Sequence, residues 1–142
     1  MRLADAAALE RAAAIFTRLA LGAAFLSGIA SRFGWWGKGV GYGSFENFTR
    51  YTAEVNAFMP WWSIPFLAWS ATVVELALGV ALVTGVWPMW TALGSAMLLF
   101  LFGTAMTISQ GIKSPLDYSV FSACAAAMML AVHEARRAGG GR

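Results

Sequence analysis

Charged side chains are scarce in this sequence. Asp, Glu, Lys and Arg together make up 12% of its 142 residues, whereas soluble domains carry about a quarter. Hydrophobic residues make up 59%, too many for one small domain to bury away from water. We therefore expect a single integral membrane domain spanning residues 1–142.

Cysteine and histidine are rarer still, with Cys124 and His133 the only examples. One cysteine excludes an intrachain disulfide and a Cys-x-x-Cys redox pair. One histidine leaves too few ligands for a typical zinc or di-iron centre, so we expect no metal site. Any redox chemistry would need an electron carrier from outside the chain.

The net charge of +3 does not indicate a nucleic-acid partner. Basic residues that bind phosphate backbones form a stripe or cluster. Here they lie at the ends of apolar segments and in one polar loop, as they do in membrane proteins. We expect membrane lipid, and no nucleic acid, around this chain.

Long apolar segments predict an all-α fold, a four-helix transmembrane bundle. Crossing a hydrocarbon core about 30 Å thick takes roughly 20 residues. Short connections after the second and third segments predict antiparallel neighbours, and Gly85 with Pro88 marks the first of these turns. The expected transmembrane helices cover residues 11–32, 63–86, 88–110 and 115–133.

The first connection, residues 33–62, is much longer. After a glycine-rich stretch, Ser44 can cap a helix at residues 45–58 that ends before Pro60. Its aromatic residues recur at three- and four-residue steps opposite a polar face, which is typical of an interfacial amphipathic helix. The neighbouring tryptophans fit an aromatic belt at the membrane surface: Trp35, Trp36, Trp61 and Trp62.

An even number of crossings places both termini on one side of the membrane. Five basic residues lie on the terminal side and four on the other. Because cytoplasmic segments carry the excess of Lys and Arg, this difference favours cytoplasmic termini. The two sets are Arg2, Arg11, Arg136, Arg137 and Arg142 against Arg32, Lys38, Arg50 and Lys113.

Arg18 and Glu75 lie inside predicted transmembrane helices. A charge at that depth costs several kcal/mol unless it faces a partner within the protein. In antiparallel helices the two residues differ in height by about 6 Å, and the small residues Gly22 and Gly79 one turn away permit close approach. We expect a buried Arg18–Glu75 ion pair, which either fixes the register of the helices or also binds a head group and passes a proton.

Asp117 is a further candidate at the outer end of the fourth predicted helix. Lys113 precedes it by four residues, a spacing that allows a local ion pair. An ion pair there is typical of a helix cap. Asp117 is nevertheless retained among the candidate head-group ligands.

Two segments of the sequence resemble the DoxX family of bacterial inner-membrane proteins. They are residues 17–22 with 25–28 in the first predicted helix (TRLALG and FLSG), and residues 74–79 in the second (VELALG). The likeness extends over residues 11–132. It implies a four-helix bundle in the bacterial inner membrane, linked to sulfur or thiol oxidation, quinone reduction or oxidative-stress defence alongside partner enzymes. The residues it carries over are Arg18 and Glu75, with Gly22, Gly28 and Gly79 as helix-packing positions.

Two functions are favoured over a third, a small transporter or channel, for which too few polar residues run through the predicted bundle. One is a quinone-linked membrane subunit of an oxidoreductase system, in which Arg18 and Glu75 lie beneath an aromatic lid that includes Trp35 and Trp36. No cofactor is expected to be covalently bound, and a thiol relay lacks its cysteine pair. The alternative is a non-catalytic membrane anchor or accessory subunit that docks a larger complex. Both hypotheses imply protein partner subunits.

Overall fold

The computed structural model describes residues 3–37 and 39–140, which fold into helices joined by loops. The long helices are α1 (Leu3–Arg32), α3 (Ile64–Thr84), α4 (Pro88–Gln110) and α6 (Val120–Gly139). The shorter ones are α2 (Phe45–Val55), α5 (Lys113–Asp117) and the 3-10 turn η1 (Trp61–Ser63). The predicted all-α fold class is confirmed.

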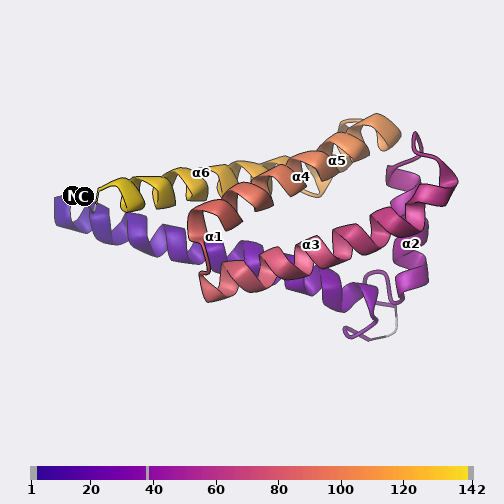
Figure 1. Ribbon diagram of the computed structural model, residues 1–142, viewed down its shortest axis with the longest axis horizontal. Coiled ribbons are helices and arrows are strands. Elements are labelled where there is room, and N and C mark those ends of the chain that lie inside the picture. Colours follow the sequence, from indigo (N-terminus) through magenta and orange to yellow (C-terminus); the bar gives the residue numbers. More distant parts are fainter. Residues whose placement is uncertain (1–2, 38, 141–142) are drawn as a thin grey trace.

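The long helices pack as two pairs, α1 with α3 and α4 with α6. Figure 1 shows α3 and α4 leaving their shared turn and separating toward the other end of the molecule, where α2 lies across both. The beginning of α1 and the end of α6 lie at the opposite end. The predicted tight turn is present, with Gly85 in the left-handed conformation (φ 75°) that ends α3.

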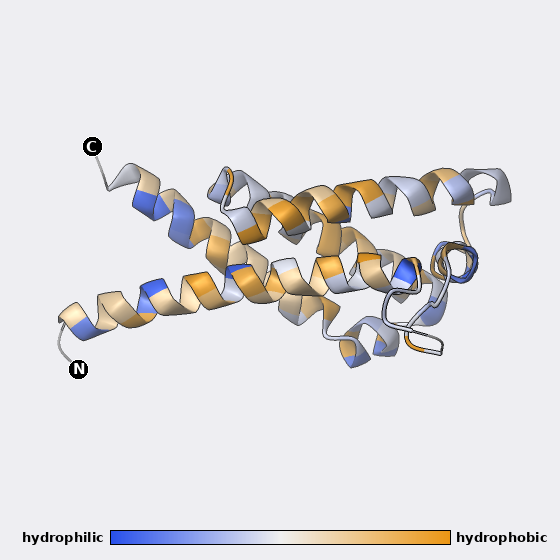
Figure 2. Ribbon diagram, turned by 90° about the horizontal axis from the view of Figure 1, so that it is seen from below, coloured by the Kyte–Doolittle hydropathy of each residue, from blue (hydrophilic) through white to orange (hydrophobic). Residues whose placement is uncertain are grey.

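The core is small and the outside is apolar. Alanines bring α4 and α6 together, since Ala92, Ala96 and Ala127 are almost fully buried. Bulky side chains point outward instead, with Phe16 75% exposed and Met129 72% exposed. Figure 2 shows apolar residues along the middle of the long helices. Such a surface is suited to lipid.

Among the described residues, three helical segments are long and apolar enough to cross a membrane. They are Ala4–Arg32, Trp61–Thr84 and Pro88–Gln110. The first begins well before residue 11, because the alanine-rich stretch after Leu3 continues the same helix. The second includes η1, which leads directly into α3.

The segment predicted as a fourth span, residues 115–133, is not one helix. The chain bends after α5, where Ser119 adopts a left-handed conformation (φ 55°), and α6 begins only at Val120. Glu134, Arg136 and Arg137 then occupy its last turns. Because of the bend, the apolar part of α6 is short. With these charged residues near its end, α6 is not among the three segments apolar enough to cross a membrane.

The helix predicted at residues 45–58 is present as α2. Ser44 caps it as expected, its hydroxyl accepting a hydrogen bond from the Asn47 N–H at 3.2 Å. It ends at Val55, earlier than predicted, because Asn56 leaves the helical conformation. Phe48 and Thr52 are buried, so α2 turns its apolar face onto the protein.

Candidate functional site

A buried ion pair joins the end of α1 to the middle of α3. The Arg32 Nη2 donates to the Glu75 carboxylate, and the two residues are 3% and 7% exposed. Arg32 Nη1 donates to the Thr72 hydroxyl at 3.0 Å. The ring of Phe48 from α2 lies against the guanidinium, with its centroid 3.8 Å from Cζ. One arginine therefore connects three helices.

The predicted Arg18–Glu75 pair is wrong, because Glu75 pairs with Arg32. Arg18 instead lies against Gly85, where an added Cβ would be 2.8 Å from its Nη1. Gly85 is ten residues after Glu75, about 15 Å along a helix. The predicted pair allowed a height difference of about 6 Å, so the predicted register of α1 against α3 was displaced by about 9 Å, or roughly two turns.

The true register follows from two glycines that the sequence analysis had placed at this contact. A Cβ added to Gly22 would lie 3.1 Å from the Gly79 carbonyl oxygen. A Cβ added to Gly79 would lie 3.2 Å from the Cβ of Phe25. Both glycines lie where α1 and α3 approach closely. Gly28 lies six residues after Gly22, and Glu75 lies four residues before Gly79. The same register therefore places Gly28 beside Glu75, whose Oε1 would lie 4.0 Å from a Cβ added to Gly28.

A cavity of about 780 Å³ lies beside the Arg32–Glu75 pair, between the diverging α3 and α4 and against α2. Val74 and Leu101 line it and are 43% and 53% exposed, so it opens outward between these two helices. Its polar lining comprises Arg32, Glu75, Tyr42, Tyr51, Thr52, Asn56, Ser70 and Tyr118. The apolar lining includes Phe48, Val55, Leu67, Val74, Leu98, Leu99, Leu101, Phe102 and Met106.

Tyr42 and Tyr51 are among the residues that line this cavity. Burial raises the pKa of Tyr42 above its ordinary value, and it is also the main reason why the pKa of Tyr51 rises to about 12. Both hydroxyls therefore stay protonated near neutral pH and can donate hydrogen bonds. A tight loop holds Tyr42, whose N–H donates to the Ser31 hydroxyl at 2.9 Å. An added Cβ on Gly41 would collide with that hydroxyl, so the loop requires glycine there.

Arg32 also offers a donor that is not yet used. Its Nε is buried and finds no hydrogen-bond partner among the described residues. A buried donor without an acceptor is unfavourable by about 1–3 kcal/mol. A ligand oxygen that entered the cavity and accepted this bond would remove the penalty.

The predicted aromatic lid does not form. Trp35 and Trp36 are 75% and 57% exposed and do not line the cavity. The Trp36 indole donates to the Ser27 carbonyl at 3.2 Å, outside the site. Trp61 and Trp62 are exposed as well. The aromatic residues that line the cavity are instead Tyr42, Phe48, Tyr51, Phe102 and Tyr118.

Asp117 also lies outside the cavity. Its carboxylate pairs with Lys113 at 2.5 Å, which confirms the predicted local ion pair. Both side chains are more than half exposed. This pair stabilises the short helix α5 and takes no part in the candidate site.

Four residues of the site were not predicted from the sequence: Arg32, Tyr42, Tyr51 and Tyr118. Arg32 was counted among loop charges because it is the last residue of its apolar segment. The Gly22–Gly79 contact could have indicated Arg32. It sets the register of α1 against α3, and this register places Arg32 next to Thr72 and Glu75. Nothing comparable marked the tyrosines.

The assembled site combines hydrogen-bond donors with largely apolar walls. It is suited to an amphiphile whose head carries accepting oxygens and whose tail leaves between α3 and α4. Comparison of the chain with protein-family models, curated proteins and solved structures finds no match.

Proposed function

We propose that this cavity binds the ring of a membrane quinone, and that the chain is a DoxX-like, quinone-linked membrane subunit of an oxidoreductase system. The observation that carries the proposal is the buried Arg32–Glu75 pair, with its unused Nε donor, at the polar end of an apolar cavity. A quinone has carbonyl acceptors on its ring and an apolar tail. The opening between Val74 and Leu101 offers that tail a route to lipid.

The site residues bind the quinone and stabilise charge. Reduction of a quinone adds two electrons and two protons to its carbonyl oxygens. Arg32 and the tyrosine hydroxyls donate to these oxygens and stabilise the negative charge that develops on them. Glu75 holds Arg32 in place and passes a proton.

The electrons come from a sulfur or thiol compound through a partner enzyme. Cys124 is the only cysteine, and it is buried with its thiol donating to the Ala96 carbonyl at 3.2 Å. The chain itself therefore does not supply a dithiol. Its task is to hold the acceptor within the membrane.

The proposal includes a membrane arrangement. The helices α1, α3, α4 and α6 cross the bacterial inner membrane as a four-helix bundle, with both termini in the cytoplasm and α2 at the outer interface. Two features support it: α6 packs along α4, and α1 begins at the end of the molecule where α6 finishes (Figure 1). With an even number of crossings, the two ends of the chain must lie on the same side of the membrane.

A second candidate function is a non-catalytic anchor or accessory subunit. The exposed tryptophans favour it, since Trp35, Trp61 and Trp62 are 75%, 85% and 69% exposed on the loops around α2. Tryptophans of this kind also anchor protein–protein interfaces. On this hypothesis the Arg32–Glu75 pair fixes only the helix register.

Quinone retention separates the two functions. The chain is purified in mild detergent from bacterial membranes, and co-purifying quinones and polypeptides are quantified by mass spectrometry. We expect stoichiometric quinone in the wild type and in the control Arg18→Met, because Arg18 lies outside the cavity. The double variant Arg32→Met/Glu75→Leu replaces the pair with apolar side chains and should lose more than about 90% of the quinone while remaining folded.

Two other results would count against this quinone site. Quinone retained by the double variant would show that the cavity pair does not bind it. A stoichiometric protein partner without quinone in the wild type would favour the accessory subunit.

A further inference from the structure

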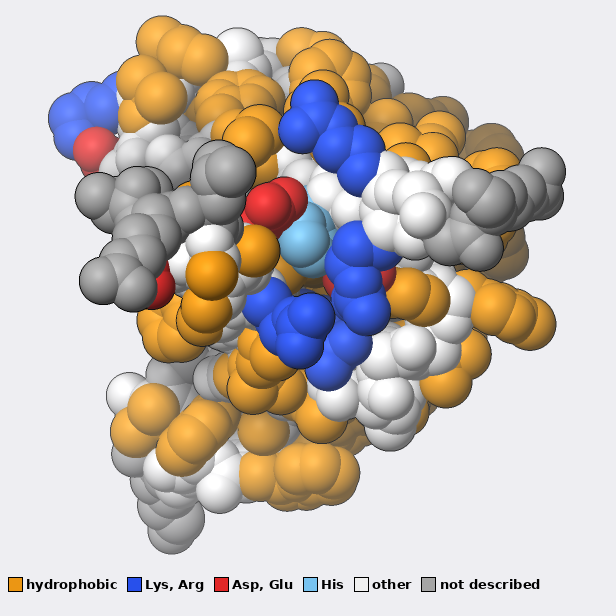
Figure 3. All heavy atoms as spheres, turned by 90° about the vertical axis from the view of Figure 1, so that its left-hand side faces the viewer, with side chains coloured by type: hydrophobic (Ala, Val, Ile, Leu, Met, Phe, Trp, Pro, Cys, Tyr) orange, Lys and Arg blue, Asp and Glu red, His pale blue; other side chains and the backbone are white. Residues whose placement is uncertain are grey.

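A second hollow lies at the other end of the molecule, between the beginning of α1 and the end of α6. Its volume is about 420 Å³. Figure 3 shows basic side chains gathered around the one histidine at this end. The lining residues are Ala7, Glu10, Arg11, His133, Arg136 and Arg137.

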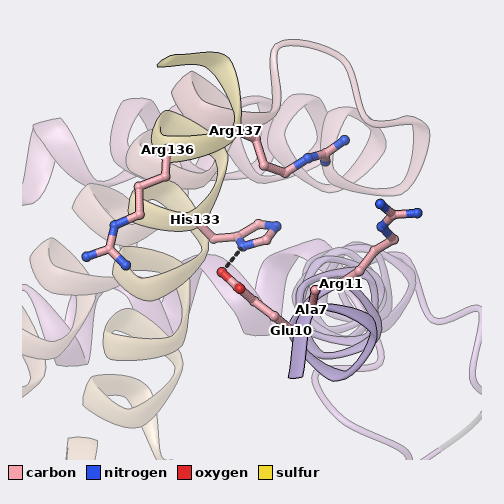
Figure 4. A pocket seen from close by; sticks show the side chains of 6 residues that line it. All are labelled: Ala7, Glu10, Arg11, His133, Arg136 and Arg137. Carbon is pink, nitrogen blue, oxygen red and sulfur yellow. Dashed lines mark hydrogen bonds and ion pairs between the residues drawn. The ribbon is translucent and has the colours of Figure 1, made fainter. Parts of the chain in front are cut away.

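The hollow carries more positive than negative charge. Its two neighbouring carboxylates already have partners, since Glu10 contacts the His133 Nδ1 at 2.9 Å and Glu134 accepts from Arg137 at 3.2 Å. Three guanidinium groups surround them. In Figure 4 those of Arg11 and Arg137 lie on the same side of the opening, while Arg136 extends from the other side of α6.

His133 leaves one nitrogen unused at the floor of the hollow. An ionised carboxylate only accepts hydrogen bonds, so the Nδ1 beside Glu10 carries the proton. The other nitrogen, Nε2, is buried and has no hydrogen-bond partner among the described residues. It accepts a bond when the ring is neutral and donates one when the ring is charged. Buried polar atoms of this kind usually have a partner in native proteins.

The hollow lies at the boundary between apolar and polar sequence. The apolar part of α1, which contains Arg18 as its one charge before Arg32, starts after Arg11, and the apolar part of α6 ends just before His133. In a membrane this is the depth of lipid head groups, where Arg and Lys meet phosphates. The guanidinium group matches phosphate geometry because it can donate two parallel hydrogen bonds.

We propose that this hollow binds a phosphate group, carried by an anionic phospholipid or supplied as free phosphate. Arg11 and Arg137 bind the phosphate oxygens, Arg136 adds positive charge at the rim of the hollow, and Nε2 of His133 bonds to a hydroxyl of the same ligand. A glycerol head group or a singly protonated phosphate provides both kinds of atom. The site is separate from the quinone cavity and does not depend on it.

Native mass spectrometry of the delipidated full chain in a charge-neutral detergent tests the proposal. The probes are phosphatidylglycerol, phosphatidylcholine of the same chain length, and inorganic phosphate. The variants are Arg11→Gln/Arg136→Gln, the charge-keeping Arg11→Lys/Arg136→Lys, and the control Arg50→Gln. Arg50 is an exposed arginine on α2, which lies at the other end of the molecule. Arg137 is left intact, since removing it would leave the buried Glu134 without its partner.

We expect phosphatidylglycerol to bind the wild type and Arg50→Gln at least about tenfold more tightly than the double Gln variant, with partial recovery in the double Lys variant. Phosphatidylcholine should bind more weakly than phosphatidylglycerol. Competition by inorganic phosphate would identify free phosphate as a ligand, and its absence would identify the lipid. Equal phosphatidylglycerol binding by the wild type and the double Gln variant, or no binding of either phosphatidylglycerol or phosphate, would overturn the proposal.

Discussion

At the scale of single residues, Glu75 stabilises the fold by neutralising Arg32. Both side chains are less than a tenth exposed, and a buried charge that loses its partner destabilises a protein by about 3–5 kcal/mol. We therefore expect Glu75→Ala to lower the melting temperature in detergent strongly. Arg32→Met/Glu75→Leu should melt near the wild type, because removing both charges leaves none uncompensated. A Glu75→Ala protein as stable as the wild type would contradict this account.

Tyr51 links stability to alkaline pH. Its pKa is about 10 in an unfolded chain and about 12 in the folded protein. The folded state therefore binds this proton more tightly, and the stabilisation is present below about pH 10 and lost as the pH rises to about 12. Thermal melts across this range should show a shallower decline for Tyr51→Phe than for the wild type. Phe45→Leu, on the same helix, removes no ionisable group and should keep the wild-type slope.

The choice of Glu75's partner shows how far sequence reasoning reached at this scale. It predicted that Glu75 is buried and paired, because an uncompensated charge among apolar residues is too costly. It selected Arg18 as the partner and left Arg32 among the basic residues at the segment ends, since heights were counted from assumed helix ends. The first helix begins at Leu3 rather than residue 11, so every height estimated along it was displaced.

At the scale of helices, the α1–α3 contact depends on glycine. A Cβ on Gly22 would lie 2.8 Å from Val83 Cγ2 and 3.1 Å from the Gly79 oxygen, whereas one on Gly28 would meet nothing closer than 4.0 Å. The two glycines lie on the same helix, so their substitutions by alanine gain the same helix propensity. We expect Gly22→Ala to destabilise the protein by about 1–3 kcal/mol through overpacking, and Gly28→Ala to leave it as stable or more so. Equal melting temperatures for the two variants would argue against close packing here.

The helix boundaries show what an apolar run can and cannot predict. Long runs located α1, α3 and α4 because a helix in lipid must satisfy its own backbone groups. The break between α5 and α6 was missed, since Tyr118 and Ser119 are uncharged and belong to the same uncharged run as the residues that follow. After the bend, α6 packs along α4 through alanines such as Ala96 and Ala127. A contact between segments distant in sequence leaves no local signal.

At the scale of the whole molecule, the polar groups are divided between the two ends. Arg32, Glu75 and the tyrosines lie where α2 crosses α3 and α4, and the basic hollow lies where α1 begins and α6 ends. Between them the surface is apolar. This division matches the membrane arrangement that we propose, in which a quinone would enter the cavity from the side and phosphates would meet the arginines at one face.

The same division makes the topology testable by cysteine labelling. Cys124→Ala supplies a background without thiols, into which Glu54→Cys on α2 or Ala138→Cys near the end of α6 is introduced; both positions are exposed. If α6 crosses the membrane alongside α4, a membrane-impermeant maleimide added to intact bacterial cells should label position 54 and reach position 138 only after permeabilisation. The opposite pattern would invert the orientation while keeping the crossings. Labelling of both positions in intact cells would contradict four crossings, because the two ends of the molecule would then share one side of the membrane.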